Sequence, residues 1–331
     1  GYNIIGIING TQYPSDVIVI SAHYDSWSII PALSPAAEDS LGISMLLEIA
    51  RLLSEHPPLR TVWLVAFSGY WEGLTGPAAW VEKYVFSPLN GHKYKILLHM
   101  DLDISSESST LDALFYGLYL TWGESSAFTS KYLTKLVPEL NSYLPQAGLN
   151  PEAVISYQFR GSYDWGTQPS FYMLSTEVST QAGVVAFTLR TQYATRERWF
   201  TPECDLRWIN WQNVATQAKI ISVIVRGLAM DRELAIDWSS SMPYRFKVTP
   251  AVTYSFVTLH GKVVEFNITQ GWYSPIPNAL VCLTPPISGA SSLYWPFMSR
   301  YTLSDMEGDF TFYGLTAYHV YWQVDAWRFD T

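Results

Sequence analysis

The chain has 331 residues and a formal net charge of −9, and 15% of its residues are charged while another 15% are aromatic. An ordinary soluble domain carries about 25% charged residues, so this surface is either covered by partners or glycans or rich in neutral polar and aromatic groups. The acidic balance argues against nucleic acids and anionic membrane surfaces as partners, because both require a basic patch.

The first two-thirds of the chain alternates predicted strands and helices. Apolar runs predict strands at residues 3–8, 16–25, 61–67, 95–103, 113–120 and 183–190. Helical periodicity predicts helices at residues 40–56, 77–86, 125–144 and 209–231. Such alternation is typical of an α/β domain in which a mainly parallel sheet has helices on both faces.

Beyond residue 235 the helical period does not recur. Short β-rich segments, separated by Gly and Pro, lie at residues 244–259, 261–269, 278–286, 309–315 and 319–327. The segment Asp305–Asp309 is the clearest hairpin turn among them. We therefore predict an α/β domain over residues 1–235 and an antiparallel β-sandwich domain, transthyretin-like or Ig-like, over residues 236–331.

Several local signals concern processing and location. Asn9 and Asn267 each begin an Asn-X-Thr sequon, which predicts N-glycosylation and an extracellular or cell-surface location. Cys204 and Cys282 are the two cysteines, and whether they form a bridge stays open. The chain begins at Gly1 directly before a strand, so we expect a processed product or a fragment of a longer protein. Any attachment to a membrane or cell surface would then lie in a segment outside this chain.

Polar side chains gather where the predicted strands end, which is the edge at which an α/β sheet binds its ligands. These side chains are His23 with Asp25, Glu38 with Asp39, and His99 with Asp101 and Asp103. Imidazole and carboxylate groups converging on one edge suit a metal such as zinc. Each group by itself is better explained as a polar pair or a helix cap, whereas the three groups together leave both interpretations open.

Several segments of the first domain follow one another in the order and spacing of a known superfamily. They are VIVISAHYDSW, AAEDSLGISMLLEIARLL, RTVWLVAFSGYWEGLTGPAAWVEKY, ILLHMDLD and RWFTPECDLRWINWQN. Through them, residues 2–230 resemble the co-catalytic di-zinc aminopeptidases, a superfamily that includes glutamate carboxypeptidase, the transferrin receptor ectodomain and nicastrin-type proteins. The resemblance implies a zinc-exopeptidase-like fold for the first domain.

The resemblance also implies a set of metal ligands, of which this chain keeps a part. His23 matches the histidine of the family's H-x-D motif, a ligand of the first metal, and Asp25 matches its supporting carboxylate. Glu38 matches the bridging aspartate, with the neighbouring Asp39 as a substitute, and Asp101 matches the aspartate that completes the first site. The resemblance therefore implies either no cofactor or a remnant site for a single zinc ion.

At three other positions this chain replaces the general base or a metal ligand of the family. By the resemblance, it therefore keeps no catalytic residue. Tyr70 replaces the general base in the segment SGYWEGLTG, Trp71 replaces a ligand of the second metal, and Phe200 replaces the last histidine ligand. Phe has no lone pair and the Trp indole nitrogen only donates, so neither binds a cation. Tyr, with a pKa near 10, is a poor base at neutral pH. We expect the three rings to fill the former cleft, and Glu72 to point along the following turn.

The C-terminal segments resemble a second kind of module. HGKVVEFNITQGWYSPIPNALVCLTPP and SDMEGDFTFYGLTAYHVYWQVDA are similar to the transthyretin-like β-sandwiches appended to carboxypeptidases. Such modules support stability or protein contacts rather than chemistry. His260 and His319 have no evident catalytic partners, so we expect no catalytic group in this part.

These observations lead to three functional hypotheses. The first is a catalytically inactive, extracellular peptidase-like domain with a structural, receptor or assembly role, acting through other proteins or self-assembly. The second is an extracellular zinc metallo-aminopeptidase that uses a one-metal site and a different base. The third is a glycan-binding or adhesive surface protein, which only the aromatic composition supports.

Overall fold

The structure, a computed structural model, describes residues 1–28, 30–86, 94–115, 135–155, 173–182, 184–234, 256–284, 300–316 and 322–328. Among these residues, a seven-stranded sheet has the order β1-β3-β2-β4-β7-β5-β6. Its strands are β1 (Ile4–Ile8), β2 (Tyr13–His23), β3 (Arg60–Phe67), β4 (Lys95–Asp103), β5 (Leu111–Leu114), β6 (Val154–Ile155) and β7 (Ala186–Thr191).

The sheet is mixed, with parallel strands at its centre. The pairs β2–β3, β2–β4, β4–β7 and β5–β6 are parallel, whereas β1–β3 and β5–β7 are antiparallel. The predicted, mainly parallel sheet is therefore confirmed, with antiparallel pairs added toward both sides. The carboxyl ends of β2, β3, β4 and β7 meet at one edge, where side chains from four separate segments can approach one another.

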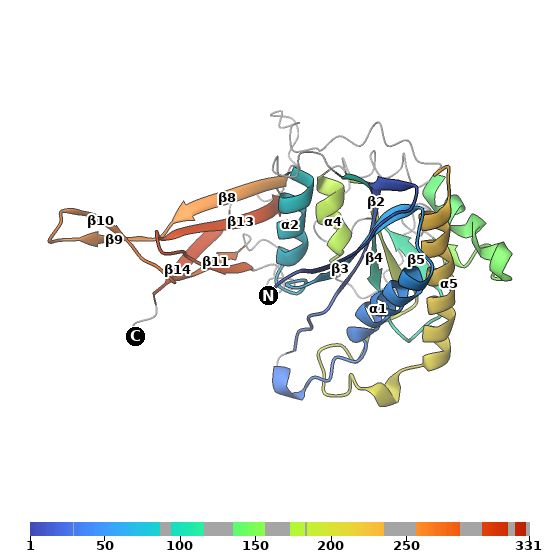
Figure 1. The fold of residues 1–331 in the computed structure, drawn as a ribbon. Helices are drawn as coiled ribbons and strands as arrows, with labels where there is room; N and C mark the ends of the chain where they lie inside the picture. Colours follow the sequence, from blue (N-terminus) through green and yellow to red (C-terminus); the bar gives the residue numbers. More distant parts are fainter. Residues whose placement is uncertain are drawn as a thin grey trace.

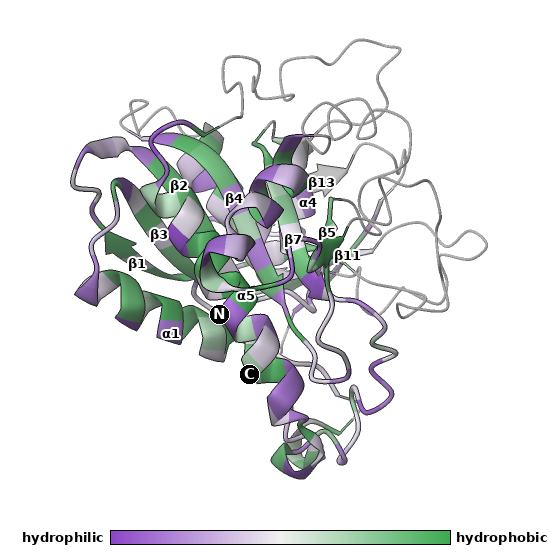
Figure 2. Ribbon diagram, turned by 90° about the vertical axis from the view of Figure 1, so that its right-hand side faces the viewer, coloured by the Kyte–Doolittle hydropathy of each residue, from purple (hydrophilic) through white to green (hydrophobic). Residues whose placement is uncertain are grey.

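Helices cover both faces of this sheet, as the alternation predicted (Figure 1). The helices α1 (Ser40–Glu55) and α5 (Trp211–Met230) lie on one face, and α2 (Thr75–Val81) and α4 (Ser175–Gln181) lie on the other. Because side chains of a strand alternate, Ile18 and Ile20 of β2 join the core beneath α1 and α5, while Val17 and Val19 join the core beneath α2 and α4. Figure 2 shows the hydrophobic strands enclosed between these helices.

Some element boundaries differ from the prediction. The helix predicted at residues 77–86 begins earlier, as α2, and continues as a π-helical turn over Glu82–Phe86. Helix α4 was not predicted. Of the helix predicted at 125–144, the described part is helical at residues 135–142, and a 3-10 turn follows at Leu144–Ala147. Two further 3-10 turns lie at Pro31–Leu33 and Leu206–Trp208. No helix in the described ranges is long and apolar enough to cross a membrane.

The C-terminal strands are antiparallel, as predicted. They are β8 (Phe256–Lys262), β9 (Val264–Asn267), β10 (Trp272–Pro275), β11 (Leu280–Thr284), β12 (Arg300–Leu303), β13 (Asp309–Thr316) and β14 (Gln323–Trp327). They pair as β9–β10, as β12–β11–β14 and as β8–β13. Val281 and Leu283 of β11 share a buried core with Phe312 of β13, so two of these small sheets pack against each other.

A turn is present at the predicted position between β12 and β13, but it does not close a hairpin, because β12 pairs with β11 and β13 pairs with β8. The Asp305 carboxylate accepts hydrogen bonds from the backbone N–H groups of Glu307 and Asp309, and Gly308 supplies the left-handed backbone that the turn requires, with φ of 79°. His260 of β8 is exposed, and its Nδ1 lies 3.0 Å from the hydroxyl oxygen of Thr311. The predicted domain boundary near residue 235 and His319 lie outside the described residues.

Candidate functional site

The strand ends of the central sheet enclose a cluster of aromatic rings. Tyr70 and Trp71 follow β3 after Gly69, which has φ of 65°, and both rings are buried. The Trp71 ring meets Tyr70, Trp199 and Phe200 edge to face, with centroid distances of 4.9, 5.3 and 5.0 Å. The structure therefore brings together the three residues predicted to fill the cleft, and adds Trp199.

Phe200 sits in this cluster with an unusual backbone conformation. Its φ is 66°, a left-handed value that bulky residues adopt only when their surroundings hold them there. Its ring meets Trp27 edge to face at 5.0 Å, and its carbonyl oxygen accepts a hydrogen bond from the Ser28 hydroxyl. The loop after β2 thus fixes Phe200 through contacts additional to that with Trp71, which makes the aromatic cluster a packed part of the core.

His23, at the end of β2, is stacked on Tyr70. The ring centroids are 4.2 Å apart and the planes differ by 13°. Burial lowers the pKa of His23, although Asp25 opposes this effect, so the imidazole is neutral at pH 7. Neither ring nitrogen has a hydrogen-bond partner among the described residues. His23 is therefore buried with its lone pair uncommitted.

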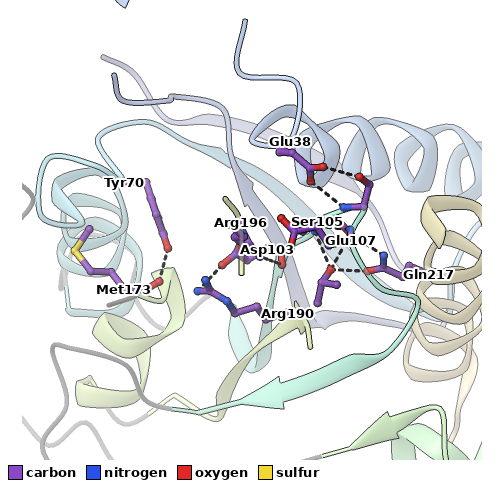
Figure 3. Close-up of polar contacts among 11 residues, drawn as sticks. Glu38, Tyr70, Asp103, Ser105, Glu107, Met173, Arg190, Arg196 and Gln217 are labelled. Carbon is purple, nitrogen blue, oxygen red and sulfur yellow. Dashed lines mark hydrogen bonds and ion pairs between the residues drawn. The ribbon is translucent and has the colours of Figure 1, made fainter. Parts of the chain in front are cut away.

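The Tyr70 hydroxyl group forms a buried hydrogen bond with a backbone carbonyl group. It donates a hydrogen bond to the backbone oxygen of Met173, just before α4 (Figure 3). Burial raises the pKa of Tyr70 well above its ordinary value. The phenol therefore stays protonated at neutral pH and has no capacity to take a proton from water.

Asp25, which the resemblance pairs with His23, makes a different contact. Its Oδ2 accepts a hydrogen bond of 3.2 Å from the backbone N–H of Trp71, and no hydrogen bond joins its carboxylate to the His23 ring. Burial raises the pKa of Asp25, and the nearby His23 partly offsets that rise. In this structure Asp25 positions the aromatic segment after β3.

Glu38 and Asp39, which precede α1, have different surroundings. Both carboxylate oxygens of Glu38 are engaged by Ser106, through its hydroxyl at 2.5 Å and its backbone N–H at 2.8 Å. Glu38 thereby fastens the loop that follows β4 (Figure 3). Asp39 is buried, its Oδ1 has no partner among the described residues, and burial raises its pKa to about 7.

His99 and Asp101 of β4 belong to a buried polar chain. The Ser21 hydroxyl donates to Asp101 Oδ1 at 2.5 Å and lies 2.8 Å from His99 Nε2, while His99 Nδ1 lies 2.8 Å from the Ser179 hydroxyl of α4. Because the single hydroxyl hydrogen of Ser21 goes to Asp101, His99 Nε2 donates and Nδ1 accepts. Burial lowers the pKa of His99 to about 3 and raises that of Asp101 to about 7.

Asp103, the last residue of β4, is held by two buried arginines that the sequence analysis did not identify (Figure 3). Arg196 donates to its Oδ1 at 2.6 Å and to its backbone oxygen at 2.9 Å, and Arg190 lies 2.9 Å from its Oδ2. Burial alone would raise the pKa of Asp103, but the two guanidinium charges outweigh it and lower that pKa. A signal was available, because Arg190 is a charged residue at the end of the apolar strand predicted at 183–190.

The comparison with models of protein families shows to which family this chain belongs. The model of peptidase family M28 matches residues 3–225. The chain belongs to peptidase family M28. The match covers the α/β part described above and includes every residue of the aromatic cluster, so the predicted resemblance to the di-zinc aminopeptidases is confirmed.

Individual relatives match this chain over short segments. A probable glutamate carboxypeptidase of Arthroderma benhamiae is 33% identical over 89 residues, which are 25% of this chain and 12% of that protein. Transferrin receptor protein 1 of Gallus gallus is 33% identical over 88 residues, which are 25% of this chain and 11% of the receptor. The matches thus span only a small part of these relatives' length.

Solved structures show the same fold at low identity. The aminopeptidase from Aneurinibacillus sp. strain AM-1 is 18% identical, with a TM-score of 0.51, over 71% of this chain and 50% of that chain. LapB from Legionella pneumophila is 20% identical, with a TM-score of 0.50, over 69% of this chain and 56% of that chain. The α/β part of this M28 protein therefore has the aminopeptidase fold.

The M28 relationship implies zinc, and the side chains at the strand ends test that implication. The Trp71 and Phe200 rings offer no lone pair to a cation, and both oxygens of Glu38 are committed to Ser106. Among the described residues, no three His, Cys, Asp or Glu side chains form a group that could hold a metal ion. These residues do not fit a co-catalytic zinc pair. Among the predicted ligands and their supporting carboxylates, the buried acceptors without a hydrogen-bond partner are the His23 ring nitrogens, Asp25 Oδ1, Asp39 Oδ1 and Asp101 Oδ2.

The other candidate residues lie apart from the aromatic cluster. Glu72 is exposed and lines a surface cavity of about 300 Å³ together with Ser68 and Lys83. Cys204 and Cys282 are both buried and free, so the structure contains no bridge between them. Of the two predicted glycosylation sites, Asn9 is exposed, whereas Asn267 Oδ1 accepts hydrogen bonds from the backbone N–H groups of residues 269 and 270.

Proposed function

We propose that this M28 family protein is a peptidase-like domain without hydrolytic activity, which serves a structural, receptor or assembly role outside the cell. The packing of Tyr70 and Trp71 against His23 and Phe200 carries this proposal. These rings occupy the positions at which the family resemblance places the general base and two ligands of the second metal. A general base typically contributes about 10²–10⁴-fold to a rate, and its loss alone would leave little turnover.

The environment of Tyr70 supports the loss of the base. The phenol donates its proton to the Met173 backbone oxygen, and burial raises its pKa, so it does not become a phenolate at neutral pH. The nearest alternative in the sequence, Glu72, is exposed on the surface and lines a separate cavity. The family resemblance places the general base in the segment that follows β3. A water molecule at His23 would therefore find no proton acceptor in that segment.

A hydrolysis assay tests the proposal directly. The purified chain would be incubated with a panel of aminoacyl-p-nitroanilides, with and without added zinc, and we expect no release of nitroaniline above buffer. The matched control is His23→Ala, which removes the proposed remnant ligand without touching a surface residue. Turnover in the wild-type chain that disappears in His23→Ala would refute the proposal, whereas equal turnover in both would identify a contaminating peptidase.

The proposed location rests on the two sequons. Asn9 is exposed just after β1, so its side-chain amide is accessible from solvent. Expression of the chain behind a secretion signal, followed by glycosidase treatment, should shift its electrophoretic mobility. Asn9→Gln should remove that shift in part or in full. Secreted chains that show no shift would contradict the glycosylation that supports this location.

A second candidate function is a metallo-aminopeptidase with a single zinc ion. The observation that favours it is a set of buried atoms without a hydrogen-bond partner, which includes the two ring nitrogens of His23, Oδ1 of Asp39 and Oδ2 of Asp101. Zinc analysis of the purified chain would separate the candidates. One zinc per chain, lost together with peptide hydrolysis in His23→Ala, would establish the second function. The glycan-binding hypothesis has exposed aromatic side chains as its sole support.

A further inference from the structure

Two buried positive charges stand at the strand ends where the M28 fold would carry its metals. Asp103 of β4 and Arg190 of β7 are direct partners in the sheet register, and both lie at the carboxyl ends of their strands. Arg196 lies in the following loop, four positions before Phe200, which replaces the last family ligand. The side chains of both arginines are at most 1% exposed, and Figure 3 shows them converging on Asp103 from two sides.

Arg190 and Arg196 both contact Asp103, as buried cations paired with a carboxylate do. Each carboxylate oxygen of Asp103 faces a different guanidinium group, and the Asp103 backbone oxygen takes a further bond from Arg196. The Trp199 ring lies beneath both charges, 4.4 Å from the Arg196 carbon Cζ and 5.6 Å from that of Arg190. Planar guanidinium groups suit both contacts, because they bind carboxylates and stack on aromatic faces.

The same charges act on the neighbouring site residues. Arg196 opposes the effect of burial on the pKa of Asp39, so its charge also stabilises that carboxylate. Both arginines add to the effect of burial on the pKa of His23 and keep its imidazole neutral. A divalent cation placed near His23 would therefore meet two fixed positive charges that are already balanced by the available carboxylates.

We propose that the guanidinium groups of Arg190 and Arg196 replace the metal cations of the M28 site and make the stability of this fold independent of zinc. This inference deepens the proposed function, on which it rests, by naming what balances the strand-end carboxylates once the metal ligands are gone. A group of arginines that replaces metal cations has one consequence that an ordinary buried ion pair does not have. Removing the two positive charges leaves Asp103 and Asp39 without a nearby cation. We expect these carboxylates, which form no metal site in the wild-type arrangement, to take up a divalent cation in place of the arginines.

Thermal unfolding in zinc and in chelator tests that consequence on the full chain. The wild-type melting temperature should be the same in micromolar zinc chloride and in EDTA. The double variant Arg190→Met/Arg196→Met, which keeps comparable side-chain length without charge, should melt lower in EDTA and regain several degrees in zinc. The matched control is Arg51→Met/Arg207→Met, because these arginines also pair with carboxylates but lie 52% and 83% exposed. This control should show no response to zinc.

Two results would overturn the inference. One is a wild-type melting temperature that falls on chelation, and the other is a folded double variant whose melting temperature ignores zinc. If the double variant does not fold, the single variant Arg190→Met is measured with the same criteria, since Arg196 still holds the loop. Zinc-dependent stability of the wild type would reject this inference while leaving the absence of hydrolysis intact. Hydrolysis without any effect of zinc on stability would instead reject the proposed function.

Discussion

The imidazole of His23 lies stacked on the phenol ring of Tyr70, with centroids 4.2 Å apart and planes 13° apart. In the family resemblance these two positions are a metal ligand and a general base, which act on the same water molecule. Here the two rings contact each other directly, and water has no space between them. The stack is neutral, because burial lowers the pKa of His23 and raises that of Tyr70.

The Tyr70→Phe variant tests whether this ring is a structural element. Removing the hydroxyl leaves the buried Met173 carbonyl without its donor, so the free energy of unfolding should fall by about 1–3 kcal/mol. The control is Tyr24→Phe, whose exposed hydroxyl donates to the Tyr2 carbonyl and should cost less than about 0.5 kcal/mol. Urea unfolding measures both. Equal losses in the two variants would contradict a buried bond at Tyr70.

The Glu38→Gln variant tests whether Glu38 is a loop clamp or a metal ligand. Gln keeps the shape but offers one acceptor oxygen, so one of the two bonds from Ser106 is lost. We expect the free energy of unfolding to fall by about 1–3 kcal/mol, because the carboxylate and its partner are buried. Glu48→Gln, in an exposed pair with Arg51, should change it by less than about 0.5 kcal/mol. A zinc content that falls in Glu38→Gln alone would show that Glu38 is a ligand.

Much of the fold follows from periodicity that the sequence displays. The alternation in β2, which sends Ile18 and Ile20 to one face and Val17 and Val19 to the other, is readable because both faces are apolar and buried. Helix α4 was missed for the opposite reason. Its residues are mostly polar, and Ser175 to Thr180 are buried by the tertiary structure rather than by a hydrophobic stripe.

The candidate site was predictable only where a motif fixed it. Tyr70 and Trp71 were placed by the segment that carries them, and the structure packs Phe200 against Trp71. The bond between Arg196 and Asp103 joins residues 93 positions apart, and no local pattern marks the arginine as buried. Long-range pairing of charges depends on which loops return to the same strand ends, and that information lies in the topology.

The Asp103→Asn variant measures the buried ion group. Asn removes the charge that both guanidinium groups share, and leaves two buried cations under-compensated. Breaking a buried pair in this way typically costs about 3–5 kcal/mol of unfolding free energy. The control is Asp205→Asn, whose partner Arg207 is exposed, and it should cost about 1 kcal/mol or less. Chemical denaturation at neutral pH gives both values, and a cost at Asp103 no larger than at Asp205 would argue against a fully desolvated pair.

The Asp39→Asn variant separates the two candidate functions through pH. The pKa of Asp39 is raised to about 7 in the folded chain, against about 3.9 when unfolded, so the unfolded chain releases its proton first. The contribution of Asp39 to the free energy of unfolding of the wild type is therefore largest below about pH 4. It declines as the pH rises and is constant again above about pH 7. Asn does not titrate and escapes this decline.

We accordingly expect Asp39→Asn to gain stability relative to the wild type as the pH rises from about 4 to about 7, by at most about 1.4 kcal/mol per pH unit. Paired urea titrations at several pH values, in EDTA and in zinc, provide the measurement. If Asp39 were a ligand of a single zinc ion, the variant would instead lose stability in zinc at pH 7 and above, because the carboxylate that binds the ion is gone. The sign of the difference in zinc-containing buffer thus decides between a fold balanced by its own arginines and one that depends on a metal.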